Sequence, residues 1–135
     1  MNSEYLLIDP RPLESFKDKT FSGFKKTEVF KALFKSIDTS KIEEACFWMT
    51  ECICSGYCQE VFEKTMLHSS KVIHINSPHL PMFLWRRYQT FLTAIDHIPV
   101  KKRSSLIHLR NTPEIRHNLI DVVVTVAMAP KHKRY

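Results

Sequence analysis

Four cysteines stand close together in the sequence, and their thiols are the most reactive side chains that it offers. They occupy positions 46, 52, 54 and 58, in the spacing Cys-x5-Cys-x-Cys-x3-Cys. Zinc ribbons and secreted disulfide frameworks use other spacings, and here all four positions fall within one predicted helical stretch. Cys54 and Cys58 share a helix face, but a zinc ion would need two more ligands from elsewhere. We therefore expect reduced, buried thiols and no metal site.

Motifs of common enzyme classes are missing from the sequence. It contains no Walker lysine loop, dinucleotide fingerprint, His-Glu-x-x-His or Gly-x-Ser-x-Gly. Glu43 and Glu44 are adjacent, so on a helix their carboxylates point about 100° apart and do not form a catalytic pair. A thiol nucleophile would need His74 or His108, and nothing in the sequence brings either of them to a cysteine. We expect a protein that is not an enzyme, with no catalytic residue and no cofactor.

The basic residues are the stronger candidates for function, because they are unevenly distributed. Residues 1–67 contain nine Lys and Arg against eleven Asp and Glu, a net charge of −2. Residues 68–135 contain eleven against three, a net charge of +8, together with all seven histidines. A positive half of this kind attracts nucleic acid, acidic proteins or anionic lipid. The alternative is a solvated basic surface that only aids solubility.

Ten cations in the second half are the predicted contacts to nucleic acid. Scattered Lys and Arg side chains bind phosphates and read little sequence. The predicted residues are Arg86, Arg87, Lys101, Lys102, Arg103, Arg110, Arg116, Lys131, Lys133 and Arg134. Trp85, Tyr88 and Tyr135 are candidates for base stacking, although for Trp85 we favour a place in the core.

Hydrophobic periodicity predicts an all-α fold, a single compact bundle of four to five helices. Helices are expected over 24–37, over 41–55 with a continuation to 69 left open, over 78–97 and over 113–129. The helix over 41–55 is apolar almost all round, so we expect it at the centre of the bundle. The run Val122-Val123-Val124 leaves a terminal strand as the alternative to the last helix.

The remaining segments define the expected boundaries. Residues 1–23 form an extended N-terminal arm, residues 24–130 the helical domain and residues 131–135 a basic tail. Apolar residues of the arm lie on the core or on a partner: Tyr5, Leu6, Leu7, Ile8, Phe16 and Phe21.

Residue types at the helix ends predict where helices start and stop. Ser40-Lys41-Ile42-Glu43 has the pattern of a capping box. Gly56 either breaks its helix or allows a neighbouring helix to come close. Ser77-Pro78 and Thr112-Pro113 are N-cap pairs that start helices.

No targeting or membrane segment is expected. The start of the chain lacks the basic and apolar regions of a signal peptide. The longest apolar run, 119–129, is interrupted by Asp121 and Thr125 and is too short to span a bilayer. With the reduced cysteines, this favours a cytoplasmic or nuclear protein that is not secreted.

Several segments together resemble a known set of proteins. They are Phe21-Ser22-Gly23-Phe24-Lys25-Lys26, Lys41-Ile42-Glu43-Glu44-Ala45-Cys46-Phe47-Trp48, an Ile-His stretch ending in Asn-Ser-Pro, Leu109-Arg110-Asn111 and Glu114-Ile115-Arg116. With these segments, most of residues 20–133 resembles short uncharacterised proteins encoded by large nucleocytoplasmic DNA viruses of eukaryotes. The resemblance implies a viral protein in the host cytoplasm or nucleus, or in the virion. It implies no catalytic or binding residue.

The sequence therefore predicts a non-enzymatic viral accessory protein. Its basic half would contact nucleic acid in genome replication, transcription or packaging, and its arm or apolar faces would contact a protein partner. The alternative is a structural or minor capsid-associated component, or an assembly adaptor, that binds an acidic protein surface. Both hypotheses leave open whether the chain associates with itself.

Overall fold

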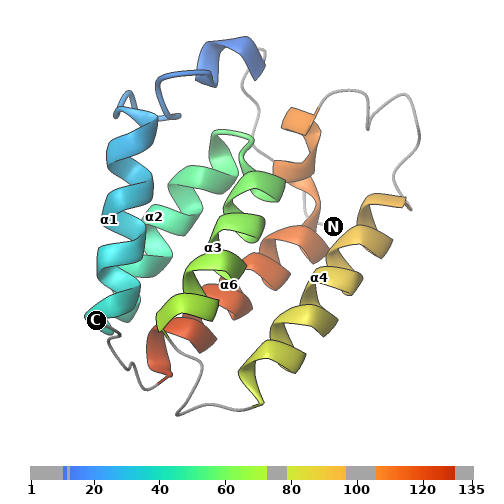
Figure 1. Cartoon of the computed structure of the whole chain (residues 1–135). Coiled ribbons are helices and arrows are strands. Elements are labelled where there is room, and N and C mark those ends of the chain that lie inside the picture. The colour runs from blue at the N-terminus through green and yellow to red at the C-terminus, as the bar shows by residue number, and fades with distance from the viewer. Residues whose placement is uncertain (1–10, 12, 73–78, 97–105, 130–135) are drawn as a thin grey trace.

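The chain folds as a helical bundle in the computed structural model, which describes residues 11, 13–72, 79–96 and 106–129 (Figure 1). The elements in chain order are η2 (Leu13–Phe16), α1 (Lys26–Asp38), α2 (Ile42–Cys54), α3 (Cys58–Val72), α4 (Leu80–Asp96), η3 (Leu106–Asn111) and α6 (Pro113–Met128). Within these residues the only β-type pairing is an isolated bridge between Lys19 and Lys25. The all-α prediction is confirmed.

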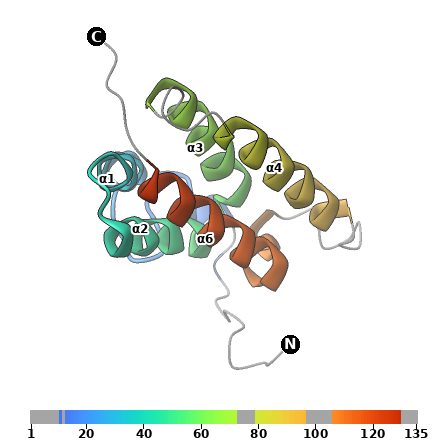
Figure 2. The ribbon, with the colours of Figure 1, turned by 90° about the horizontal axis from the view of Figure 1, so that it is seen from below.

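The last helix, α6, is the centre of the bundle. It contacts α1, α2, α3, α4 and η3, and Figure 2 shows it running between the α1–α2 pair and the α3–α4 pair. Its side chains at Ile115, Leu119, Val122, Val123 and Val126 are fully buried. The valines are helical, so the alternative of a terminal strand was wrong: burial against every neighbour outweighs their modest β preference.

The prediction that 41–55 is the central helix was also wrong. Helix α2 buries one face, which includes Ala45, Met49 and Cys52, but Phe47 on its outer face is 55% exposed. Its polar residues Glu43 and Glu44 lie on the same exposed side. Large apolar residues around a helix do not require burial on all sides, because much of any protein surface is apolar.

Gly56 ends helix α2, which settles the two interpretations of this glycine. Its φ of 83° lies in the left-handed region, where side chains cost energy and glycine does not. The N–H of Gly56 donates to the carbonyl of Ile53 (3.0 Å), and the N–H of Tyr57 donates to that of Cys52 (3.0 Å). This pair of bonds is a Schellman motif. It stops α2 and starts α3 as a separate helix.

The same motif joins α1 to α2, with a serine in the glycine position. Ser40 has a φ of 56°, its N–H donates to Ile37 (3.1 Å), and the N–H of Lys41 donates to Ser36 (2.9 Å). The predicted capping box is therefore wrong. The N-cap of α2 is Lys41, with no side-chain cap, because Ser40 is used to terminate the preceding helix. At α6 the N-cap is Thr112 and Pro113 is the first helical residue, as predicted.

Part of the predicted arm packs on the bundle. Phe16, in η2, is 1% exposed and belongs to the hydrophobic core. The backbone N–H of Phe21 donates to Ser55 Oγ (2.7 Å), and that of Ser22 donates to the buried carboxylate of Glu51 (2.6 Å). Residues 16–22 are thus fastened to the end of α2, while Tyr5, Leu6, Leu7 and Ile8 lie outside the described residues.

Candidate nucleic-acid interface

Arg86 is the predicted phosphate contact that is most open to solvent among the described residues. It lies on the outer face of α4, is exposed, and its side chain has no ion pair or hydrogen bond within the described part of the chain. A cation with no partner of its own is available to an anionic ligand.

Arg87, its neighbour, instead holds α4 against α6. Its Nη2 lies 3.3 Å from Asp121 Oδ2, and its guanidinium lies 5.3 Å from the centre of the Phe83 ring. Asn118 of α6 donates to the Arg87 carbonyl (2.8 Å). The guanidinium is engaged within the protein, so we do not keep Arg87 as a phosphate contact.

Arg110 and Arg116 also serve the fold. Arg110 is only 4% exposed and donates from Nη1 to the carbonyl of Cys54 (2.8 Å). Arg116 donates from Nε to the carbonyl of Arg110 and from Nη2 to Asn111 Oδ1 (3.2 Å). The two arginines fasten η3 to the end of α2 and to the first turn of α6.

The other six predicted cations lie outside the described residues. Lys101, Lys102 and Arg103 follow α4, and Lys131, Lys133 and Arg134 follow α6. Segments 97–105 and 130–135 contain these six cations and no acid, so they carry +6 of the +8 of the second half. They continue from the C-terminal ends of α4 and α6, which lie on opposite sides of the bundle (Figures 1 and 2).

Trp85 is exposed, which contradicts the expected place in the core. The side chain is 55% exposed on the outer face of α4. Tyr88, three residues on, does pack inward, with its ring 5.2 Å from that of Phe62. The signal that was missed is the helix period: Trp85 lies about 100° from the buried Leu84 and beside the polar Gln89.

Two of the four cysteines, Cys52 and Cys58, belong to the core, whereas Cys46 and Cys54 are half-buried. None of the four cysteines forms a disulfide. Burial raises the pKa of the Cys52 thiol and raises that of Cys58 to about 12. Burial also raises the pKa of Cys54, which the nearby Arg110 and Arg116 only partly offset. A thiol nucleophile must be a thiolate, and burial disfavours that form by raising the pKa of each of these thiols. Within the described residues no three His, Cys, Asp or Glu side chains are placed to share a metal ion.

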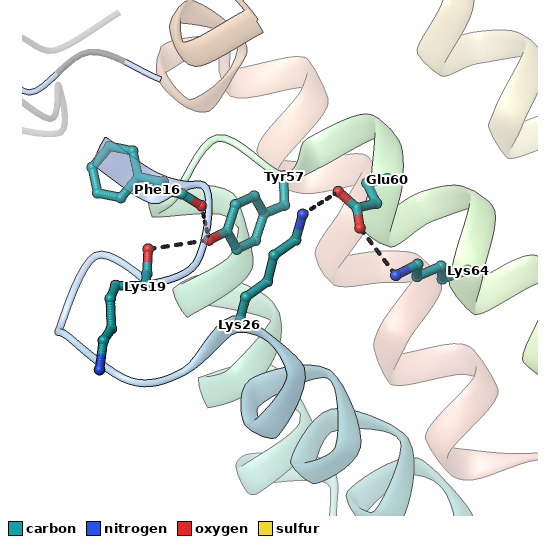
Figure 3. A network of polar contacts seen from close by, with 6 residues as sticks. All are labelled: Phe16, Lys19, Lys26, Tyr57, Glu60 and Lys64. Carbon is teal, nitrogen blue, oxygen red and sulfur yellow. Dashed lines mark hydrogen bonds and ion pairs between the residues drawn. The ribbon is translucent and has the colours of Figure 1, made fainter. Parts of the chain in front are cut away.

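A polar network near the start of α3 was not predicted from the sequence (Figure 3). Glu60 forms ion pairs with Lys26 (2.7 Å) and Lys64 (3.0 Å). Burial alone would raise the pKa of Glu60, but the hydrogen bonds and charges of the two lysines lower it overall. Lys26 also lies 4.7 Å from the centre of the Tyr57 ring. These residues join α1 to α3. Their geometry does not indicate a ligand site.

A shallow pocket lies between α1 and α2. Its volume of about 170 Å³ is below the roughly 300 Å³ at which small-molecule sites begin. It is lined by Ala32, Lys35, Ser36, Thr39, Lys41, Glu44 and Trp48. Next to it the Trp48 ring makes edge contacts with Phe24 (5.5 Å) and Phe47 (4.8 Å). We assign this face no ligand.

Comparison of the chain with protein-family models, with curated proteins and with solved structures finds no match. Among the described residues no helix combines the length and the apolar character needed to cross a membrane. The binding function proposed below is therefore argued from the chain's own residues, and its biological setting from the resemblance described above.

Proposed function

We propose that the protein is a non-enzymatic nucleic-acid-binding accessory protein, whose cations are concentrated in the two segments that follow α4 and α6. The observation that carries this proposal is that the ten predicted cations fall into two groups, one with side-chain contacts inside the protein and one without described side-chain contacts. Arg87, Arg110 and Arg116 are used to hold helices together. The other seven are Arg86 and the six Lys and Arg of 97–105 and 130–135.

This arrangement favours binding through phosphates rather than base reading. A cation that contacts a phosphate releases condensed counterions, which gives affinity without sequence specificity. The two basic segments continue from opposite sides of one bundle, so a single protein would contact a strand at two separated places. Each contact would raise the effective concentration of the other.

The resemblance to short viral proteins supplies the biological setting of this proposal. We infer a contact with a viral genome or transcript during replication, transcription or packaging, in the host cytoplasm or nucleus or in the virion. The proposal needs no cofactor and no membrane.

The test is binding of labelled oligonucleotides by variants that remove three cations at a time. We expect Lys101→Ala/Lys102→Ala/Arg103→Ala and Lys131→Ala/Lys133→Ala/Arg134→Ala each to weaken binding at low salt. The matched control is Lys17→Ala/Lys25→Ala/Lys31→Ala, which removes three exposed lysines from the first half. Equal losses in all three variants would show that only net charge matters, and no binding by the parent protein would refute the proposal.

A second candidate is an assembly adaptor whose basic segments bind an acidic protein surface. It is favoured by the exposed aromatic side chain of Phe47, which lies outside the basic segments and can add an apolar contact to a partner protein. Affinity purification from infected cells, with and without nuclease, separates the two candidates. A partner protein that is retained after nuclease treatment supports the adaptor, and one that is lost supports nucleic-acid binding.

A further inference from the structure

The outer face of α4 carries a small patch that differs in charge from the exposed aromatic surface around Phe47 on α2. Met82, Trp85, Arg86 and Gln89 are all exposed. Met82 and Gln89 each lie three or four residues from both Trp85 and Arg86, so they are neighbours of both on the helix surface. Trp85 and Arg86 are consecutive, and their side chains diverge by about 100° around the exposed side of the helix. The patch therefore combines a flat aromatic ring, an apolar side chain, a cation and an amide.

The tryptophan of this patch has no ring partner among the described residues. Trp85 is 55% exposed, whereas the other tryptophan, Trp48, is half-buried and contacts the rings of Phe24 and Phe47. An exposed indole offers a flat face to a ligand, and a large aromatic side chain gains free energy when it is covered.

Charge distinguishes this exposed ring from the one on α2. Phe47 is exposed to the same extent as Trp85, 55%, but Glu43 and Glu44 precede it by four and three residues on its helix. Trp85 is adjacent to Arg86, and residues 64–95 contain no Asp or Glu. The first acid beyond the patch on α4 is Asp96, about 16 Å further along the helix axis from Trp85. An acid of α6, Asp121, does reach this helix, but it pairs with Arg87 and leaves Arg86 exposed. The charges near Trp85 thus favour an anionic ligand more than the charges near Phe47 do.

We propose that Trp85 stacks on an unpaired base of a single-stranded nucleic acid, while Arg86 contacts the adjoining phosphate. Aromatic rings beside cations are the standard means of binding single strands, because every base has a face that can stack. Bases inside a duplex are already stacked and offer no such face to a helix side chain. This inference rests on the proposed function and deepens it, since it names single strands as the ligand.

The experiment compares short oligothymidine, oligouridine and a DNA duplex by fluorescence anisotropy at low salt. We expect Trp85→Ala to weaken binding of single strands by about 5- to 150-fold, the range of one lost base stack, with little change for the duplex. Trp85→Phe retains a ring and should keep most of the affinity. Phe47→Ala is the control, because it removes an equally exposed ring, and it should leave binding unchanged.

A second readout is direct. In a Trp48→Phe background Trp85 is the single tryptophan of the chain, and its fluorescence should be quenched when single strands bind. The comparison of DNA with RNA shows which sugar is preferred.

Failure of this inference can be told apart from failure of the proposed function. Suppose that the parent protein binds single strands and that the triple basic variants bind them more weakly. If Trp85→Ala and Phe47→Ala then both leave the affinity unchanged, the stacking role is refuted and the proposed function stands. The same conclusion follows if the chain binds duplex alone, or if Trp85→Ala abolishes capture of a protein but not of single strands. If the parent protein binds no nucleic acid, both proposals are refuted.

Discussion

Arg110 donates a hydrogen bond from Nη1 to the backbone carbonyl of Cys54, 2.8 Å away and 56 positions earlier in the chain. The bond ties η3 to the end of α2, and the carbonyl of Arg110 in turn accepts from Arg116. The buried position of this guanidinium explains why a basic residue of the second half contributes to the fold rather than to a charged surface.

We therefore expect Arg110→Ala to lower stability and Arg86→Ala to leave it almost unchanged. Loss of a charged, buried donor costs about 1.5–3 kcal/mol, whereas an exposed substitution usually falls within about 0.5 kcal/mol. Urea denaturation of the two variants and the parent measures both values. Equal stabilities for the two variants would contradict the structural role of Arg110.

Tyr57 should stabilise the attachment of the N-terminal segment. Its hydroxyl donates to the carbonyl of Phe16 and lies within hydrogen-bond distance of that of Lys19 (3.2 Å) (Figure 3). Tyr57→Phe removes the hydroxyl and keeps the ring, so we expect a loss of about 1–2 kcal/mol from the free energy of unfolding. Tyr88→Phe is the control, because no hydrogen bond of the Tyr88 hydroxyl is found among the described residues. A loss as large in the control would show that the Tyr57 bonds are not what stabilises the segment.

The two Schellman turns give predictions of opposite sign. Ser40→Gly should raise stability by about 1 kcal/mol, because Ser40 has a φ of 56° and a side chain in this region is strained. Gly56→Ala should lower stability by about 1–2 kcal/mol, since it introduces that strain at a φ of 83°.

A serine within a helix provides the control for the first of these variants. Ser70→Gly replaces an exposed serine of α3, where glycine is unfavourable, and should lower stability. Thermal denaturation of the three variants and the parent protein measures these changes in stability. Destabilisation by Ser40→Gly as well as by Ser70→Gly would show that the strain at Ser40 is negligible.

Stability should fall at alkaline pH. Burial raises the pKa values of Cys58 and Tyr57 to about 12, from ordinary values of 9.0 and 10.0, and it also raises that of Cys52. The unfolded chain loses these protons at lower pH than the folded chain. The stabilisation is thus complete below about pH 9 and is lost as the pH rises towards 12.

Urea denaturation of the reduced protein at neutral pH and above pH 9 measures this loss. In Cys52→Ala/Cys58→Ala the decline should be less steep, although the variant starts from lower stability because two buried side chains are shortened. A decline of the same steepness in the double variant would show that other groups cause it.

Much of the fold could be predicted from local sequence patterns. Pro113 marks the start of α6, and the spacing of Ile115, Leu119, Val122 and Val126 identifies its buried face. The end of α2 at Gly56 was one of two interpretations that the conformational freedom of glycine allowed. These features depend on residues within a few positions of one another, and the sequence displays such relationships directly.

The candidate site was less predictable, because it depends on contacts between distant positions. The sequence does not show that Arg110 would reach Cys54, or that Arg87 would meet Asp121. Three of the ten predicted phosphate contacts, Arg87, Arg110 and Arg116, make contacts within the protein for this reason. The central place of α6 was missed in a similar way, since α2 and α6 are both rich in apolar residues and only packing decides which is enclosed.

The salt dependence of binding measures how many of the predicted cations contact the phosphates of a nucleic acid. The logarithm of the association constant for a single strand should fall linearly with the logarithm of salt concentration, with a slope of about 0.7 for each phosphate neutralised. Replacing the six cations Lys101, Lys102, Arg103, Lys131, Lys133 and Arg134 by alanine should flatten this slope by about four. The same change in the lysines at 17, 25 and 31 should leave it as in the parent protein. A slope that is unchanged by the six replacements would show that these cations do not bind the nucleic acid.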